Sequence, residues 1–107
     1  MATILHPTLE AFVKAQNDHD TDALLQCFTT DALVHDEGRD YRGAAAIRAW
    51  SDDVIQKYRL SAEVRDVVEQ GDEIKVTSLV SGNFDGSPAE LTYLFKIRDG
   101  KITEFRA

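Results

Sequence analysis

Three aspartates at alternating positions, Asp18, Asp20 and Asp22, have the spacing of the first ligands of a calcium-binding loop. Such a loop also needs a glycine where this chain has Ala23 and a closing glutamate where it has Thr29. Without them the loop would neither turn sharply nor close around the ion. We therefore interpret the three acids as helix-capping residues, whose side-chain oxygens accept hydrogen bonds from backbone N–H groups.

The histidines and the single cysteine give little support for metal or nucleophilic chemistry. His6, His19 and His35 lack the close spacing of a pair carried on one helix, so we predict no metal site and expect His6 and His19 at the surface. His35 precedes Asp36 on a predicted strand, where neighbouring side chains point to opposite faces, so the two are not expected to act together. Cys27 has no partner for an internal disulfide, and stability must come from packing.

The composition is that of an ordinary globular domain. Of the 107 residues, 43% are hydrophobic and 29% are charged, so we expect one domain spanning residues 1–107. The net charge of -7 would repel nucleic-acid backbones and anionic lipids, and we expect neither nucleic acid nor a membrane as a partner. Apolar runs are too short to cross a bilayer, and the first residues lack an export signal. These features predict a cytoplasmic protein.

The first half of the chain shows helical periodicity. Apolar residues recur at helical spacing over residues 8–18, which predicts a first helix beginning beside Pro7. Asp20 is the expected cap of a second helix, which ends near Phe28. Gly43 precedes the third and longest helix. Its apolar stripe, typical of a helix lying on a sheet, consists of Ile47, Trp50, Val54 and Tyr58.

The second half of the chain alternates with a period of two. A short strand at residues 32–36 separates the second and third helices, and four strands are predicted after Tyr58. Turn sequences at residues 71–72, 85–88 and 99–100 separate these strands, which favours antiparallel pairing.

This order of elements predicts an α+β domain in which three N-terminal helices cover one face of an antiparallel sheet. Long strands twist and curl, so we expect a cone-shaped, curved sheet that encloses a cavity with the helices. Cavities of this kind bind small molecules, and a small apolar ligand is therefore the expected partner.

Three segments carry a resemblance to a known superfamily. They are the run from Leu9 to Glu37, the Arg-Gly-Ala-Ala-Ala-Ile-Arg segment at 42–48, and the Gly-Lys-Ile-Thr-Glu-Phe-Arg segment at 100–106. Together they resemble the nuclear transport factor 2-like superfamily over almost the whole chain, nearest to its SnoaL-like and ketosteroid isomerase-like branches. The superfamily also contains epoxide hydrolases, dehydratases and non-catalytic binding domains, so the resemblance is more specific for the fold than for the function.

The resemblance implies two catalytic residues. Asp36 matches a carboxylate that serves as general base inside the cavity, although the residues alone favour an Asp that caps a turn or is solvated. Tyr93 aligns with the group that donates a hydrogen bond to a developing enolate, with Thr92 as the alternative one position away. A second donor is missing, because Phe12 stands where ketosteroid isomerases carry a tyrosine on the first helix.

The resemblance also implies the walls of the binding site. Phe12, Phe28 and Trp50 would form apolar surfaces for the substrate, with ordinary core packing as the alternative interpretation for each. The implied reaction is proton transfer on an apolar carbonyl compound, of isomerase or cyclase type, and it needs no cofactor or metal. The alternative is a non-catalytic ligand-binding or dimerisation module of the same fold.

Homodimerisation through the outer face of the sheet is a further implication, because members of the superfamily commonly pair in this way. The alternation of side chains places Val67, Leu79 and Leu94 on the face opposite the main apolar rows of their strands. Apolar residues gathered on an exposed sheet face are typical of a surface that meets a partner.

Overall fold

The computed structural model describes residues 6–107. The prediction that the first residues carry no export signal therefore falls mostly on residues outside this range. The elements in chain order are α1 (Pro7–Asn17), α2 (Thr21–Leu25), β1 (Phe28–Asp36), β2 (Arg39–Arg42), α3 (Ala44–Tyr58), β3 (Ser61–Gln70), β4 (Glu73–Ser81), β5 (Ala89–Arg98) and β6 (Lys101–Arg106). The three predicted helices and the later four strands are thus confirmed.

The first two helices start as their sequences indicate. Pro7 occupies the first turn of α1, and the Asp20 side chain caps α2 by accepting a hydrogen bond of 3.1 Å from the backbone N–H of Ala23. The predicted end of α2 near Phe28 is wrong. The helix stops at Leu25, and Phe28 already pairs with Ile102 in the sheet, where burial and strand hydrogen bonds replace a further helical turn.

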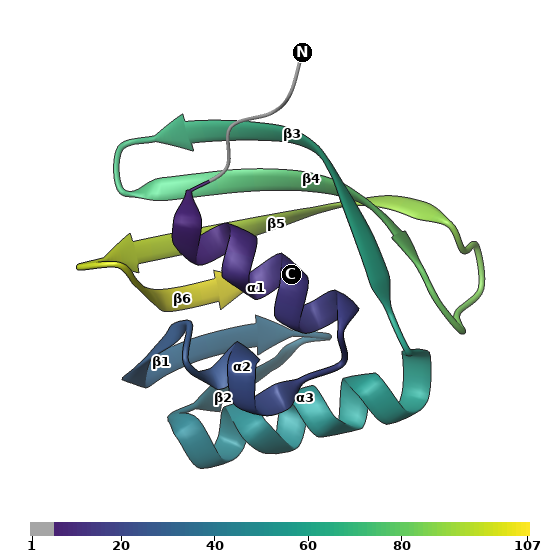
Figure 1. Ribbon diagram of the computed structural model, residues 1–107, viewed down its shortest axis with the longest axis horizontal. Helices are drawn as coiled ribbons and strands as arrows, with labels where there is room; N and C mark the ends of the chain where they lie inside the picture. Colours follow the sequence, from purple (N-terminus) through teal and green to yellow (C-terminus); the bar gives the residue numbers. More distant parts are fainter. Residues whose placement is uncertain (1–5) are drawn as a thin grey trace.

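The sheet has six strands in the order β2-β1-β6-β5-β4-β3 (Figure 1). The α+β class is confirmed, but the sheet is mixed instead of wholly antiparallel, because β1 and β6 run parallel. The turns that can be recognised in the sequence join strands that are consecutive along the chain. The last strand enters between β1 and β5, a pairing between distant segments for which the sequence has no local signal.

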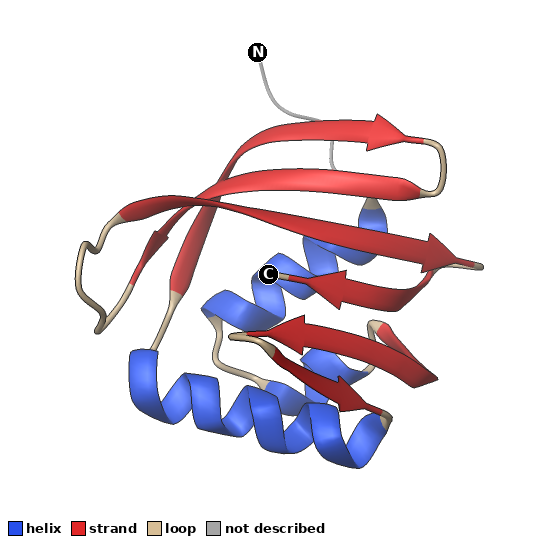
Figure 2. Cartoon of the chain, turned by 180° about the vertical axis from the view of Figure 1, so that it is seen from behind, coloured by secondary structure: helices blue, strands red, loops and turns tan. Residues whose placement is uncertain are grey.

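The sheet is strongly curved, and the three helices lie on its concave side (Figures 1 and 2). Its edge strands, β2 and β3, do not pair with each other, so the sheet remains open. The core fills the space between the concave face and the helices. Its largest fully buried side chains are Phe12, Phe95, Leu9, Ile47, Ile102, Val34 and Val80.

A β-bulge in β3 corrects one sequence prediction. Val64 pairs with Ser78 but Asp66 pairs with Thr77, so the strand has one extra residue at this point. The extra residue reverses the alternation that follows. Val67, predicted on the outer face, therefore pairs with the buried Val76 and packs against the core.

Within residues 6–107, no helix combines the length and the apolar character that crossing a bilayer requires.

Candidate functional site

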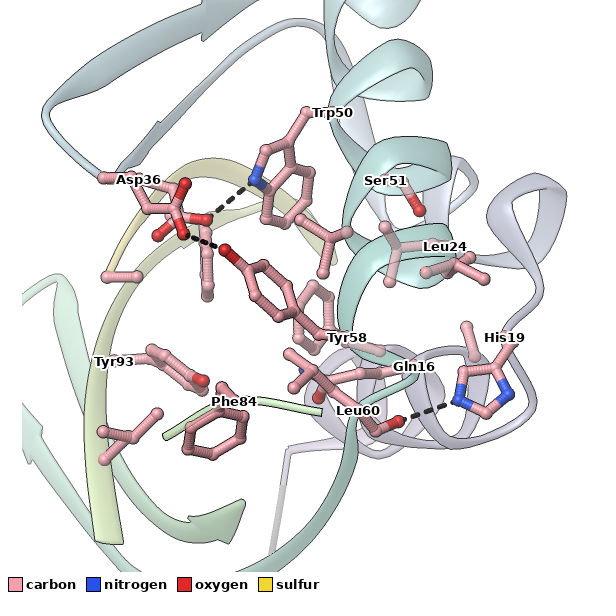
Figure 3. Close-up of a pocket in the computed structure, with 18 of the residues that line it drawn as sticks. Gln16, His19, Leu24, Asp36, Trp50, Ser51, Tyr58, Leu60, Phe84 and Tyr93 are labelled. Atoms are coloured by element: carbon pink, nitrogen blue, oxygen red, sulfur yellow. Dashed lines mark hydrogen bonds between the residues drawn. The ribbon is translucent and has the colours of Figure 1, made fainter. Parts of the chain in front are cut away.

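A cavity of about 380 Å³ lies between the concave face of the sheet and the helices (Figure 3). This volume is at the small end of the roughly 300–1,000 Å³ of typical ligand pockets. The lining residues come from α1, α2, α3, β1, β5, β6 and the connecting loops. The apolar side chains among them include Phe12, Leu24, Trp50, Val54, Ile55, Leu60, Phe84, Leu91 and Phe105.

Asp36 is a half-buried carboxylate at the end of β1 that lines the cavity. Its Oδ2 accepts a hydrogen bond of 2.9 Å from the indole N–H of Trp50 on α3 (Figure 3). The neighbouring His35 is bound elsewhere, because its Nδ1 lies 2.6 Å from the Asp40 carboxylate on β2. The prediction that His35 and Asp36 do not act together agrees with these separate partners.

Tyr93 comes from the middle of β5 and points into the cavity (Figure 3). It pairs with the buried Val76 on the inner face, and 8% of its surface is exposed. Burial, and next the charge of Asp36, raise the pKa of the Tyr93 hydroxyl to about 12, so the group stays protonated at neutral pH. Thr92 also borders the cavity, but its hydroxyl lies 3.1 Å from that of Thr77, its pair across β4.

Aromatic rings form one continuous wall of the cavity. The ring centroid of Phe105 lies 5.5 Å from that of Phe12, 5.6 Å from that of Trp50 and 5.2 Å from that of Tyr93. Phe28 does not line the cavity. It starts β1, whereas Asp36 ends this strand, and its ring packs edge-on behind Phe12 at 6.1 Å in the core.

Sequence reasoning missed several polar residues of the lining, among them Tyr58, Glu37 and His19. The hydroxyl of Tyr58, at the end of α3, donates a hydrogen bond of 2.9 Å to Oε1 of Glu37. Tyr58 belongs to the apolar stripe of α3, and this position was the sequence signal that it faces the cavity. His19, expected at the surface, is half-buried and lines the cavity, with Nε2 2.9 Å from the carbonyl oxygen of Leu60.

The loop between β4 and β5 contributes Phe84 to the lining. It is anchored beside the cavity, since the backbone N–H of Asn83 donates a hydrogen bond of 2.8 Å to the carbonyl oxygen of Tyr58. A Cβ atom on Gly82 would lie 2.6 Å from the same oxygen, so glycine permits the close approach.

Comparison with known proteins identifies a matching family and solved structures of the same fold. The sequence profile of the SnoaL-like domain matches residues 9–105. The crystal structure of a proposed polyketide cyclase from Sinorhizobium meliloti is 37% identical and superposes with a TM-score of 0.90, covering 95% of this chain and 94% of that chain. No curated protein matches the sequence.

Two more distant structures share the fold. A Catenulispora acidiphila protein with a ketosteroid isomerase-like fold, in complex with trimethylamine, is 18% identical, with a TM-score of 0.82 and coverage of 96% of this chain and 85% of that chain. The Mycobacterium tuberculosis protein RV0760c, in complex with estradiol-17β-hemisuccinate, is 19% identical, with a TM-score of 0.78 and coverage of 92% and 88%.

Proposed function

This chain belongs to the SnoaL-like domain family, and we propose that it is a cofactor-independent enzyme that transfers a proton on an apolar carbonyl compound. The observation that carries the proposal is the placement of a carboxylate, Asp36, and a protonated phenol, Tyr93, on the walls of one largely apolar cavity. The similar Sinorhizobium meliloti protein, a proposed polyketide cyclase, supports chemistry of this type.

The proposed reaction needs two groups with different roles. Asp36 removes a proton from the carbon next to the carbonyl, and Tyr93 donates a hydrogen bond to the oxygen on which the negative charge develops. The proton held by Asp36 is then returned to the same or another carbon of the bound compound. Trp50 holds one carboxylate oxygen of Asp36 at 2.9 Å and leaves the other oxygen for the substrate.

The test is deuterium exchange at the carbons next to the carbonyl, followed by NMR over a panel of apolar ketones. Asp36→Asn is expected to abolish exchange, and Tyr93→Phe to slow it by about 10²-fold, the effect of losing one hydrogen-bond donor to an oxyanion. Asp40→Asn is the matched control, because this carboxylate on β2 is engaged with His35 and does not line the cavity. Equal exchange by the Asp36→Asn and Asp40→Asn variants would contradict the proposal.

Two observations favour a second candidate function, that of a non-catalytic binding module. The N–H of Trp50 already occupies one oxygen of the Asp36 carboxylate, and Phe12 supplies no hydroxyl to the cavity. In this function Asp36 orients a ligand without reacting with it. Asp36→Asn would then change the affinity for ketones, while wild-type protein would bind them without any exchange.

Pairing of two copies through the outer face of the sheet is part of the proposal. Leu79 and Leu94 are half-buried there, and Val68, which the bulge turns outward, is 38% exposed. Light scattering at micromolar concentration is expected to give the mass of a dimer, and Leu94→Lys to give that of a monomer. A wild-type monomer would contradict this part of the proposal.

A location in the cytoplasm also stays a prediction.

A further inference from the structure

Asp36 and Glu37 are the carboxylates of the cavity, and no lysine or arginine of residues 6–107 lines it with them. None of the ion pairs within residues 6–107 includes the carboxylate of Asp36 or that of Glu37. Lys57, whose charge interacts with Glu37, is bound 3.2 Å from Asp53. The protein itself therefore leaves the negative charge at this end of the cavity without an ion-pair partner.

The groups that do contact the carboxylates are neutral aromatic side chains. Trp50 donates its indole N–H to Asp36, and Tyr58 donates its hydroxyl to Glu37, each over 2.9 Å (Figure 3). Each donor occupies one carboxylate oxygen and does not neutralise the charge. The hydrogen bond and the negative charges of Glu37 and Asp36 raise the pKa of Tyr58, so its ring stays uncharged at neutral pH.

Tyr93 offers a hydrogen-bond donor to a ligand in the cavity. Its side chain is more than nine-tenths buried and is aimed into the cavity (Figure 3). No residue within 6–107 accepts a hydrogen bond from its hydroxyl in the structure. The hydroxyl is not among the fully buried polar atoms that lack a partner within residues 6–107, so either water or a ligand oxygen in the cavity can accept its hydrogen bond.

We propose that the cavity binds an organic cation, namely an alkylated or protonated amine on an apolar body that also carries a hydrogen-bond acceptor. The ammonium group lies against the rings of Trp50 and Tyr58 and beside the carboxylates of Asp36 and Glu37. Ring faces attract cations, and tryptophan does so most strongly. The apolar body contacts Phe12 and Phe105, and the acceptor meets the Tyr93 hydroxyl.

The inference rests on the proposed function only in using the same cavity, and it narrows the substrate class to carbonyl compounds that carry an amine. It also excludes a class of ligand. A carboxylate or phosphate would lie beside the charges of Asp36, which is half-buried, and Glu37, which is exposed, and the repulsion by Asp36 is screened less than in bulk water.

The test uses three compounds of similar size and different charge. Phenyltrimethylammonium is the cation, tert-butylbenzene is its neutral isostere, and benzoate is the anion. Trp50 is the single tryptophan of the chain and lines the cavity, so its fluorescence reports binding directly. The cation is expected to bind at least about tenfold more tightly than the isostere, in line with a desolvated cation–π contact aided by the carboxylates.

Variants test whether the two carboxylates cause the preference for the cation over its neutral isostere. In the double variant Asp36→Asn with Glu37→Gln, the preference for the cation over the isostere is expected to fall close to unity, while Asp40→Asn keeps the wild-type ratio. A second measurement needs no variant: raising the salt concentration should weaken binding of the cation and leave the isostere unchanged. Equal binding of cation and isostere by wild-type protein, or tightest binding of benzoate, would overturn the inference.

The deuterium-exchange experiment separates this inference from the proposed function. A preference for cations without exchange on any ketone, including aminoketones, would overturn proton transfer and support the cation site. Exchange that depends on Asp36, together with equal affinity for phenyltrimethylammonium and tert-butylbenzene, would overturn the cation site and leave the proposed reaction supported.

Discussion

The indole N–H of Trp50 donates a hydrogen bond of 2.9 Å to the carboxylate of Asp36 and so joins the middle of α3 to the end of β1. Both side chains line the cavity and both residues are half-buried. The orientation of the carboxylate therefore depends on a helix that the chain reaches only after β2. A change in the position of α3 would move the proposed base relative to Tyr93.

This relationship predicts a measurable coupling between the two residues. In a double-mutant cycle of Trp50→Phe and Asp36→Ala, we expect a coupling free energy of about 1 kcal/mol, because one variant removes the donor and the other removes its charged acceptor. Urea denaturation measures the four free energies of unfolding. A cycle of Trp50→Phe with Asp40→Ala is the control and should be additive. Additivity in the first cycle would contradict the prediction.

Much of the fold could be predicted because its local signals are strong. The stripe of α3, Pro7 at the start of α1, and the glycine turns of the last strands each act within a few residues of the chain. The parallel pairing of β1 with β6 and the bulge before Asp66 have no such signal, since strand neighbours and register depend on distant segments. One inserted residue was enough to reverse the predicted face of Val67.

The candidate site was predictable to a smaller extent. Asp36, Tyr93, Phe12 and Trp50 do line one cavity, as the resemblance implied. Phe28 does not, because residues at opposite ends of one strand lie far apart, and only the structure shows which end meets the cavity. The contact between Tyr58 and Glu37 joins residues that are separated by a strand and a helix, and sequence spacing alone does not reveal it.

Gly82 is expected to be required for the position of the loop that carries Phe84. In Gly82→Ala, the new Cβ would lie 2.6 Å from the carbonyl oxygen of Tyr58 and 2.8 Å from Cδ2 of Leu60, so the loop must shift. Overpacking of this kind costs about 1–3 kcal/mol of unfolding free energy. Asn83→Ala is the control in urea denaturation, because it removes an exposed side chain and keeps the backbone hydrogen bond to Tyr58. Equal stability of both variants would refute the close approach.

Thr29 offers a stabilising substitution. Its hydroxyl oxygen is buried and has no hydrogen-bond partner within residues 6–107. Valine has nearly the same shape and no polar atom, so Thr29→Val is expected to raise the free energy of unfolding by about 1 kcal/mol. Thermal or urea denaturation checks this against Thr30→Val, an exposed neighbour for which we expect almost no change. A loss of stability in Thr29→Val would show that the hydroxyl has a partner.

Tyr93 predicts how stability changes at alkaline pH. Burial and the charge of Asp36 raise its pKa from 10.0 to about 12 in the folded protein. Between these values the unfolded chain loses the phenolic proton while the folded protein keeps it, so the free energy of unfolding falls as the pH rises. A shift of this size corresponds to a loss of roughly 3 kcal/mol, complete above the folded pKa.

The measurement that checks the Tyr93 prediction is urea denaturation at a series of alkaline pH values, comparing wild type with Tyr93→Phe and Tyr41→Phe. Phenylalanine at position 93 removes the titrating group, so this variant should lose much less stability than wild type over the same range. Tyr41→Phe controls for general alkaline unfolding, because that tyrosine does not line the cavity and its replacement leaves Tyr93 in place, so the steep decline should remain. An unchanged decline in Tyr93→Phe would mean that another group titrates, and the evidence for a desolvated phenol facing the cavity would fail with it.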